Sequence, residues 1–129
     1  VVFEDGRIVD AKAEVGEEVF LELLKTDDGS SRLGEVALVP NSSPISISGL
    51  LFYNTLYDEN ASSHIALGQC YSKCFRNDIG QDPKAVADAG GNVSNIHVDW
   101  MIGSDKMDID GIDSDGNRTP VMRSGEWAF

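Results

Sequence analysis

The 129-residue chain is long enough to bury a core of its own and suits a single domain over residues 1–129. Its composition, 41% hydrophobic and 25% charged, is ordinary for a folded soluble protein. The formal net charge of −12 argues against binding to nucleic acids or anionic membranes, because both need a basic surface. In addition, no apolar run is long enough to span a membrane. From the charge and from the lack of such a run, we expect neither nucleic-acid nor membrane partners.

The first third of the chain predicts a hairpin, a helix and a strand. Residues 1–3 and 7–13 read as strands on either side of an Asp-Gly turn. Residues 17–25, EEVFLELLK, carry apolar side chains at helical spacing and predict a short amphipathic helix. Residues 33–40 read as a buried strand that Pro40 closes, and the serine-rich residues 41–48 read as a loop.

The remaining chain predicts one longer helix and several strands. The apolar spacing of residues 61–73 predicts a helix on which His64 and Tyr71 share a face. Further on we expect a short helix at 83–89, a strand at 95–104, and a hairpin of 107–112 with 119–123. The fold class is therefore a mixed α/β (α+β) domain that is rich in β-structure and has a few short helices.

The most informative stretch is Asn95-Ile96-His97-Val98-Asp99-Trp100. Side chains alternate between the two faces of a strand, so His97 and Asp99 project from the same side. An imidazole and a carboxylate fixed on one rigid face make half of a divalent-metal site. The alternative is a hydrogen-bonded His–Asp pair on a half-exposed strand.

Glu35 and His64 extend this pair to a set of four candidate metal ligands. Glu35 lies in a hydrophobic strand, where a carboxylate is costly unless it is solvated, paired or metal-bound. His64 is one of only two histidines, and both fall in the set. Mixed nitrogen and oxygen ligands favour Zn, Co or Mn, and two such ions can share an activated water. Tyr71 is a candidate to donate a hydrogen bond to a developing oxyanion, or else a packing aromatic.

Two cysteines allow a competing interpretation. Cys70 and Cys74, with His64 upstream, allow a structural zinc site, although the spacing matches no standard zinc finger and a fourth ligand is missing. Two free thiols are the simpler interpretation, and they suit a reducing, cytoplasmic location.

Three motifs, in this order, give the chain a family resemblance. They are GEVALVP at residues 34–40, LFYNTLYDENASSHIALG at residues 51–68, and IHVDWMIG at residues 96–103. Together they resemble the aminopeptidase T family of metallo-aminopeptidases, which includes aminopeptidase S and PepS, and the resemblance covers nearly the whole chain.

The resemblance implies a cytosolic, two-metal exopeptidase that removes N-terminal residues from peptides and forms homodimers. By motif match, the metal ligands correspond to Glu35, His64, His97 and Asp99. Tyr71 corresponds to the tyrosine near the catalytic centre. Glu35 is also a candidate to position or deprotonate the attacking water. Family members are longer and have a further glutamate ligand upstream. The chain thus resembles the C-terminal part of a two-domain metallopeptidase, which we expect to bind metal weakly and to be almost inactive alone. The alternative function is a non-catalytic module for dimerisation or substrate gating.

Overall fold

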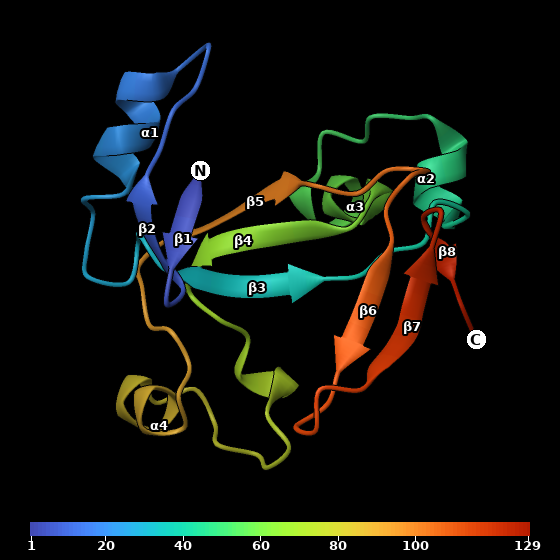
Figure 1. Cartoon of the computed structure of the whole chain (residues 1–129). Helices are drawn as coiled ribbons and strands as arrows, with labels where there is room; N and C mark the ends of the chain where they lie inside the picture. Colours follow the sequence, from blue (N-terminus) through green and yellow to red (C-terminus); the bar gives the residue numbers. More distant parts are fainter. The chain divides into compact units, whose positions relative to one another are not determined.

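The computed structural model describes residues 1–129 and has the mixed α/β, β-rich fold that the sequence predicts (Figure 1). No helix is long and apolar enough to cross a membrane. The strands are β1 (Val2–Glu4), β2 (Arg7–Asp10), β3 (Leu33–Ala37), β4 (His64–Gly68), β5 (His97–Met101), β6 (Ile109–Ile112), β7 (Arg118–Arg123) and β8 (Glu126–Trp127). The helices are α1 (Glu17–Leu23), α2 (Pro44–Ser48), α3 (Thr55–Asp58), α4 (Pro83–Asp88) and the 3₁₀ turns η1 (Glu59–Ala61) and η2 (Ser72–Cys74).

The chain divides into two compact units. Unit 1 comprises Val1–Val36 and Ile65–Asp99, and unit 2 comprises Ala37–His64 and Trp100–Phe129. Each unit therefore contains two segments that are separated in the sequence. A single domain over residues 1–129 stays a prediction.

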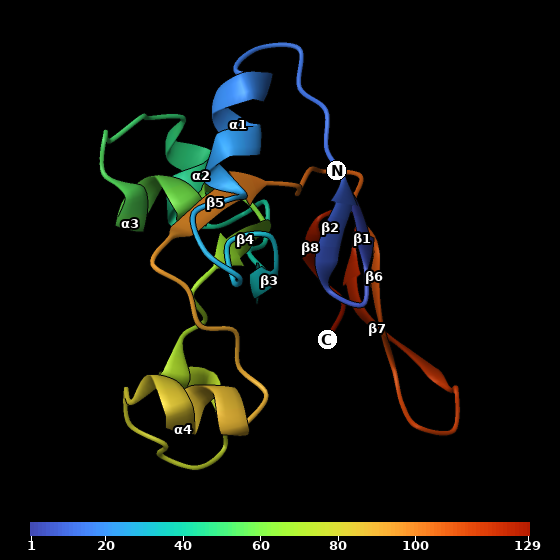
Figure 2. The same ribbon diagram turned by 90° about the vertical axis from the view of Figure 1, so that its left-hand side faces the viewer.

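Unit 1 is built on the sheet of order β3-β4-β5 (Figure 1). The β1–β2 hairpin forms a second, antiparallel sheet, as the Asp-Gly turn predicts. Ala66 and Leu67 of β4 are completely buried, and Val86 of α4 is 2% exposed. Both views place α1 and α4 at opposite ends of this unit, with the three-stranded sheet between them (Figure 2). The core of unit 1 therefore lies at the central strand, between the strands that carry the candidate ligands.

The helix predicted over residues 61–73 is wrong. The structure has strand β4 there, followed by the turn η2. Four of the five β4 residues are buried, so the strand carries apolar residues on both faces instead of alternating. Periodicity cannot distinguish such a short apolar run from a helix segment. His64 and Tyr71 accordingly do not share a helix face.

Unit 2 begins with a short helix where a loop was predicted. The hydroxyl of Ser43 accepts a hydrogen bond from the Ser46 backbone N–H at 3.1 Å, and Pro44 occupies the first turn of α2. Both features stabilise a helix start. The serine hydroxyl pairs with one of the free N–H groups of the first turn, and proline has no N–H that would stay unpaired there. The serine-rich composition therefore marks a helix cap, and the prediction of a loop over residues 41–48 is wrong.

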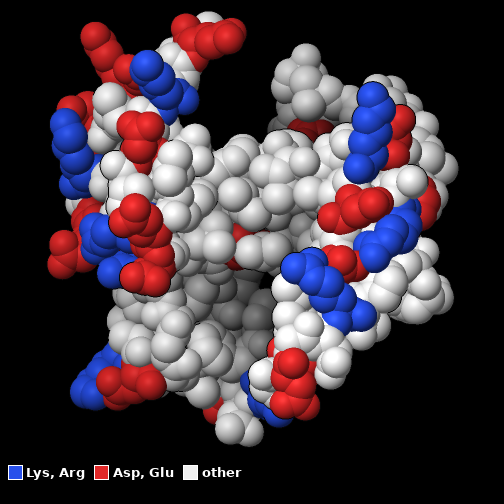
Figure 3. Space-filling view, viewed as in Figure 1, with Lys and Arg blue, Asp and Glu red and all other residues white.

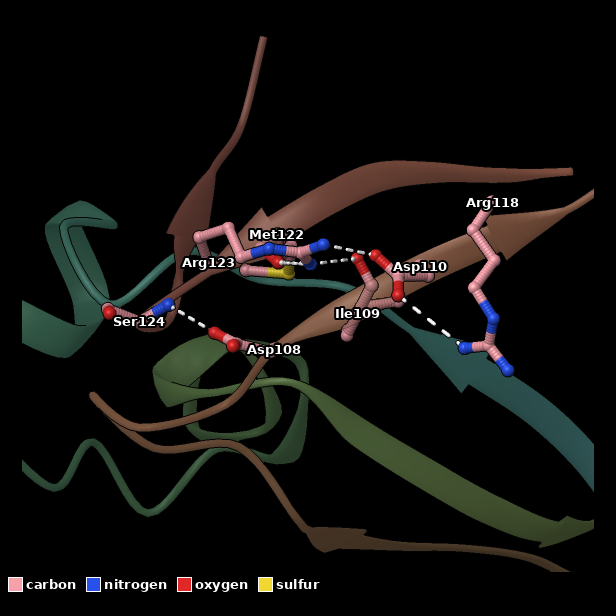
Figure 4. Close-up of polar contacts among 7 residues, drawn as sticks. All are labelled: Asp108, Ile109, Asp110, Arg118, Met122, Arg123 and Ser124. Atoms are coloured by element: carbon pink, nitrogen blue, oxygen red, sulfur yellow. Dashed lines mark hydrogen bonds and ion pairs between the residues drawn. The ribbon is translucent and has the colours of Figure 1, made fainter.

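The sheet of order β6-β7-β8 completes unit 2, with Met122 of β7 fully buried. The predicted β6–β7 hairpin is confirmed, and its register pairs Gly111 with Thr119. Asp110 on β6 lies between two guanidinium groups of β7, that of Arg123 and that of Arg118 at 3.6 Å (Figure 4). The hydrogen bond from Arg123 is the main reason that the pKa of Asp110 is lowered.

The surface is acidic overall but mixed in sign. Figure 3 shows Lys and Arg side chains interspersed with Asp and Glu over the face in view. Lys25 with Glu22 is one exposed pair, 2.6 Å apart on the α1 side of unit 1. Such pairs favour solubility and contribute little to stability. On the face in view, acidic side chains lie next to basic ones and do not form a single acidic patch (Figure 3).

Candidate metal centre

Strands β3 and β5 bring Glu35, His97 and Asp99 together in unit 1. The Nε2 atom of His97 lies 3.3 Å from Oε2 of Glu35 and 3.2 Å from Oδ1 of Asp99. Since His97 and Asp99 are two residues apart on β5, the pleat of the strand alone puts them on one side. Glu35 comes from β3, on the other side of the central strand β4. The predicted same-face pair is thus joined by a carboxylate that is distant in sequence.

Backbone contacts at the end of β4 set the spacing of these strands. The N–H of Gly68 donates to the carbonyl of Arg32 at 2.9 Å, and the N–H of Gln69 donates to the carbonyl of Ile96 at 2.7 Å. Gly68 has a φ of +91°, and a Cβ added there would lie 2.1 Å from the Ile96 oxygen. A side chain at this position would force β4 and the start of β5 apart, so glycine keeps the ligand-bearing strands close.

The three ligand atoms form a buried polar group. The Asp99 side chain is 7% exposed, and those of His97 and Glu35 are 22% and 21% exposed. The Nε2 of His97 and Oδ1 of Asp99 are buried atoms that make no hydrogen bond. At a buried position, two carboxylate oxygens repel each other unless a positive charge lies between them. Here that charge is either a proton on the imidazole ring or a bound cation.

The donor set fits a divalent metal ion. One oxygen of Glu35, one of Asp99 and a ring nitrogen of His97 all lie within 4.8 Å of one another. Zinc–ligand bonds of about 2.0–2.2 Å put neighbouring donors of a tetrahedral site roughly 3.4 Å apart, which is close to the two distances at His97. Nitrogen and carboxylate donors suit Zn, Co or Mn better than Ca or Mg.

The orientation of His97 is fixed by the protein backbone. Its Nδ1 lies 2.6 Å from the carbonyl oxygen of Gln69, which can only accept a hydrogen bond. Nδ1 therefore carries the proton, and in the neutral ring the Nε2 lone pair faces the two carboxylates. Metal-binding histidines usually have this arrangement, because the second hydrogen bond fixes both the tautomer and the ring orientation.

Tyr71 lies beside His97, whereas the predicted helix placed it on one face with His64. Its ring centroid is 5.0 Å from that of His97, and the two planes are tilted by 58°. Tyr71 precedes η2 and is 47% exposed. Its position beside a candidate ligand, with part of its surface in solvent, suits a group that contacts a bound substrate.

An open cavity of about 310 Å³ adjoins these residues, and Glu35 and Tyr71 form part of its wall. The other lining residues include Leu33, Val36 and Phe75, which are apolar, and the two cysteines. Cys70 and Cys74 are free thiols, and neither belongs to the donor group around His97. Pockets of this size, apolar with a few polar groups, are typical of small-ligand sites.

His64, the fourth predicted ligand, belongs to unit 2. Its side chain is 2% exposed, and its Nδ1 lies 3.0 Å from the carbonyl oxygen of Ser62. A carboxylate oxygen of Glu59 in η1 lies within 4.8 Å of a His64 ring nitrogen. Glu59 is not among the ligands predicted from the sequence, because an acidic residue beside another acidic residue has no spacing that marks a metal ligand. The place of His64 in one ligand set with Glu35, His97 and Asp99 stays a prediction.

Comparisons with known proteins agree on one family. A family model described as thermophilic metalloprotease (M29) matches residues 1–127. Aminopeptidase AmpS of Bacillus subtilis is 54% identical over 129 residues, which are all of this chain and 32% of that protein. Aminopeptidase T of Thermus thermophilus is 54% identical over 125 residues, 97% of this chain and 30% of that protein. The solved structure of wild-type AmpT from Thermus thermophilus covers 98% of this chain and 31% of its own, with a TM-score of 0.86 and 54% identity. The chain thus spans about a third of the length of these relatives.

Proposed function

The chain belongs to the M29 family of thermophilic metalloproteases, and from this membership we propose that it forms the metal-binding part of an aminopeptidase. The reaction is the release of N-terminal residues from peptides by metal-dependent hydrolysis. Relatives named as aminopeptidases, each about half identical to this chain, support the assignment. The observation that carries it is the buried group of Glu35, His97 and Asp99, whose donor atoms face one another.

The metal would be held by Glu35, His97 and Asp99. His64, in unit 2, stays a further predicted metal ligand. Two divalent ions, of Zn, Co or Mn, are the proposed cofactors. When bound, such ions lower the pKa of a coordinated water and stabilise negative charge on the reacting carbonyl oxygen. Glu59, close to His64, adds a carboxylate to the donors available in unit 2.

The residues of unit 1 would have separate tasks during hydrolysis. The Gln69 carbonyl holds the Nδ1 proton of His97, so that Nε2 stays directed at the carboxylates. Glu35 reaches both the cavity and His97, which suits a carboxylate that orients the attacking water and takes its proton. Tyr71, in the same cavity wall, is the candidate donor to the oxyanion.

The cavity, whose wall has both apolar and polar residues, gives room for the side chain of the first peptide residue. Leu33, Val36 and Phe75 would contact it. We further propose a cytoplasmic enzyme that acts as a homodimer. A sedimentation measurement on the intact protein would test the dimer.

A metal-binding experiment tests the assignment. The His97→Ala variant removes the nitrogen donor, and we expect it to lose bound Co²⁺ or Zn²⁺, measured by elemental analysis after dialysis. The Asp115→Ala variant is a control, because it removes an exposed carboxylate from the β6–β7 turn of unit 2. Unaltered metal content in His97→Ala would instead support a non-catalytic module for dimerisation or substrate gating.

Turnover gives a second test. The isolated 129-residue chain should release little or no leucine from a small peptide, even with added Co²⁺ or Zn²⁺. The reason is that the resemblance places one more carboxylate ligand upstream of the matched region. Robust turnover by the isolated chain would contradict this argument for a missing ligand.

A further inference from the structure

Asp27, in the loop between α1 and β3, holds the segment that leads into β5. Its Oδ1 accepts hydrogen bonds from the Ser94 hydroxyl at 2.8 Å and from the Ser30 hydroxyl at 2.8 Å. Its Oδ2 accepts from the Asn95 backbone N–H at 2.7 Å. Ser94 and Asn95 follow Asp27 by 67 and 68 residues, so these bonds connect the two sequence segments of unit 1.

The same segment is bound on its other side by Gln69. The side-chain oxygen of Gln69 accepts from the Ser94 N–H at 3.0 Å, and its backbone N–H donates to the Ile96 carbonyl at 2.7 Å. The Ser94 hydroxyl also accepts from the Ile96 N–H at 3.2 Å. The three residues before His97 are thus held by hydrogen bonds from both sides. The Gln69 carbonyl that fixes the His97 ring belongs to the same network.

This arrangement is more than a local turn. Asp27 also accepts from the Gly29 N–H at 3.0 Å, as an aspartate does in an ordinary turn, but its bonds to Ser94 and Asn95 reach another part of the chain. These hydrogen bonds, led by that from the Asn95 backbone, lower the pKa of Asp27 from 3.8 to about 2. The carboxylate is therefore ionised at neutral pH and available as an acceptor for all of them.

We propose that Asp27 is a positioning residue for the metal centre, which sets the approach of His97 to Glu35 and Asp99 by fixing Ser94 and Asn95. The inference rests on the proposed metal-binding function and adds to it a residue that contacts no ligand. Partners outside the ligand shell tune metal affinity because they limit how far a ligand can move.

A Co²⁺ titration of the intact protein, followed by visible absorption, tests this role. Asp27→Asn keeps the size of the side chain but replaces one acceptor oxygen by an NH₂ group, which cannot accept from the Asn95 N–H. We expect Co²⁺ to bind about tenfold more weakly, with altered absorption bands that report a changed ligand geometry. Asp27→Ala removes all the hydrogen bonds of this carboxylate, so its effect should be larger.

Asp113→Asn is the matched control. Asp113 is also a loop aspartate whose pKa is lowered by hydrogen bonds, chiefly from Asn117, but its partners are all within four residues in the β6–β7 turn of unit 2. The control should keep the wild-type Co²⁺ affinity and spectrum even if it unfolds more easily. Urea unfolding of each metal-free variant separates loss of stability from loss of metal affinity.

Each outcome distinguishes the positioning role from the metal site itself. If His97→Ala abolishes Co²⁺ binding while Asp27→Asn and Asp27→Ala bind like the wild type, Asp27 has no positioning role and the metal site stands. If His97→Ala binds Co²⁺ like the wild type, both proposals are overturned. Should Asp27→Ala fail to fold, Ser94→Ala replaces it, because it removes the hydroxyl that joins Asp27 to the Ile96 N–H. Wild-type affinity in Ser94→Ala and Asp27→Asn would then count against the proposal.

Discussion

Gly68→Ala is the substitution that most directly tests how the ligand-bearing strands are spaced. The new Cβ would lie 2.1 Å from the Ile96 carbonyl oxygen and 2.8 Å from its carbon, so backbone must move. The oxygen that moves also accepts the hydrogen bond from the Gln69 N–H. Since Ile96 immediately precedes His97, the displacement reaches the candidate metal centre.

The expected loss of stability has three sources. A non-glycine residue with a φ near +91° is disfavoured by about 1–2 kcal/mol. Forced displacement of packed atoms costs about 1–3 kcal/mol, and loss of the Gln69 bond about 1 kcal/mol. We therefore expect Gly68→Ala to lower the free energy of unfolding by about 3–6 kcal/mol, a large part of the stability of a typical domain.

Gly116→Ala is the control that separates the cost of the steric clash from the cost of placing a non-glycine residue at a positive φ. Gly116 has a similar φ of +83°, but an added Cβ would meet nothing within 4 Å. This control should lose only about 1–2 kcal/mol. Urea unfolding followed by far-UV circular dichroism gives both values, and a Co²⁺ titration should show weaker binding in Gly68→Ala alone. Equal losses in the two variants would refute the close-approach argument.

Three further predictions concern the core, acid stability and the cysteines. Leu67→Ala should lower the free energy of unfolding by about 3–5 kcal/mol in a urea titration, because Leu67 is fully buried in β4. Asp27 has a lowered pKa, so its stabilising contribution is complete above 3.8 and is lost as the pH falls towards about 2. Asp27→Asn should remove that part of the acid dependence, which urea midpoints over this range would show; an unaltered dependence would exclude it. Replacing Cys70 and Cys74 by serine should leave metal content unchanged, whereas a structural zinc site would require the double variant to unfold.

The part of the site that sequence reasoning could predict depends on short-range geometry. The two-residue spacing of His97 and Asp99 on a strand determines their common face, and the structure brings their side chains to 3.2 Å. Glu35 joins them only through the sheet order β3-β4-β5, which no local pattern encodes. Its selection came from its cost in an apolar strand and from the family motif, and not from any calculation of distance.

The errors also have physical causes. The run around Leu67 is buried on both faces, so it lacks the alternation by which a half-exposed strand is recognised. No sequence pattern points to Asp27, because a sequence shows no sign of a hydrogen bond that spans 68 positions. Hydrogen bonds between residues that are far apart in the sequence are therefore the features that a sequence predicts least well.

The split organisation of unit 1 has a consequence for biosynthesis. Glu35 leaves the ribosome long before His97 and Asp99, and the last strand of the β3-β4-β5 sheet is also the last to be made. A nascent chain that ends before β5 contains Glu35 but lacks His97 and Asp99, so the donor group of these three residues cannot form in it. The proposed metal site is therefore complete only after strands that are distant in the sequence have paired, and such non-local pairing is a slow step of folding.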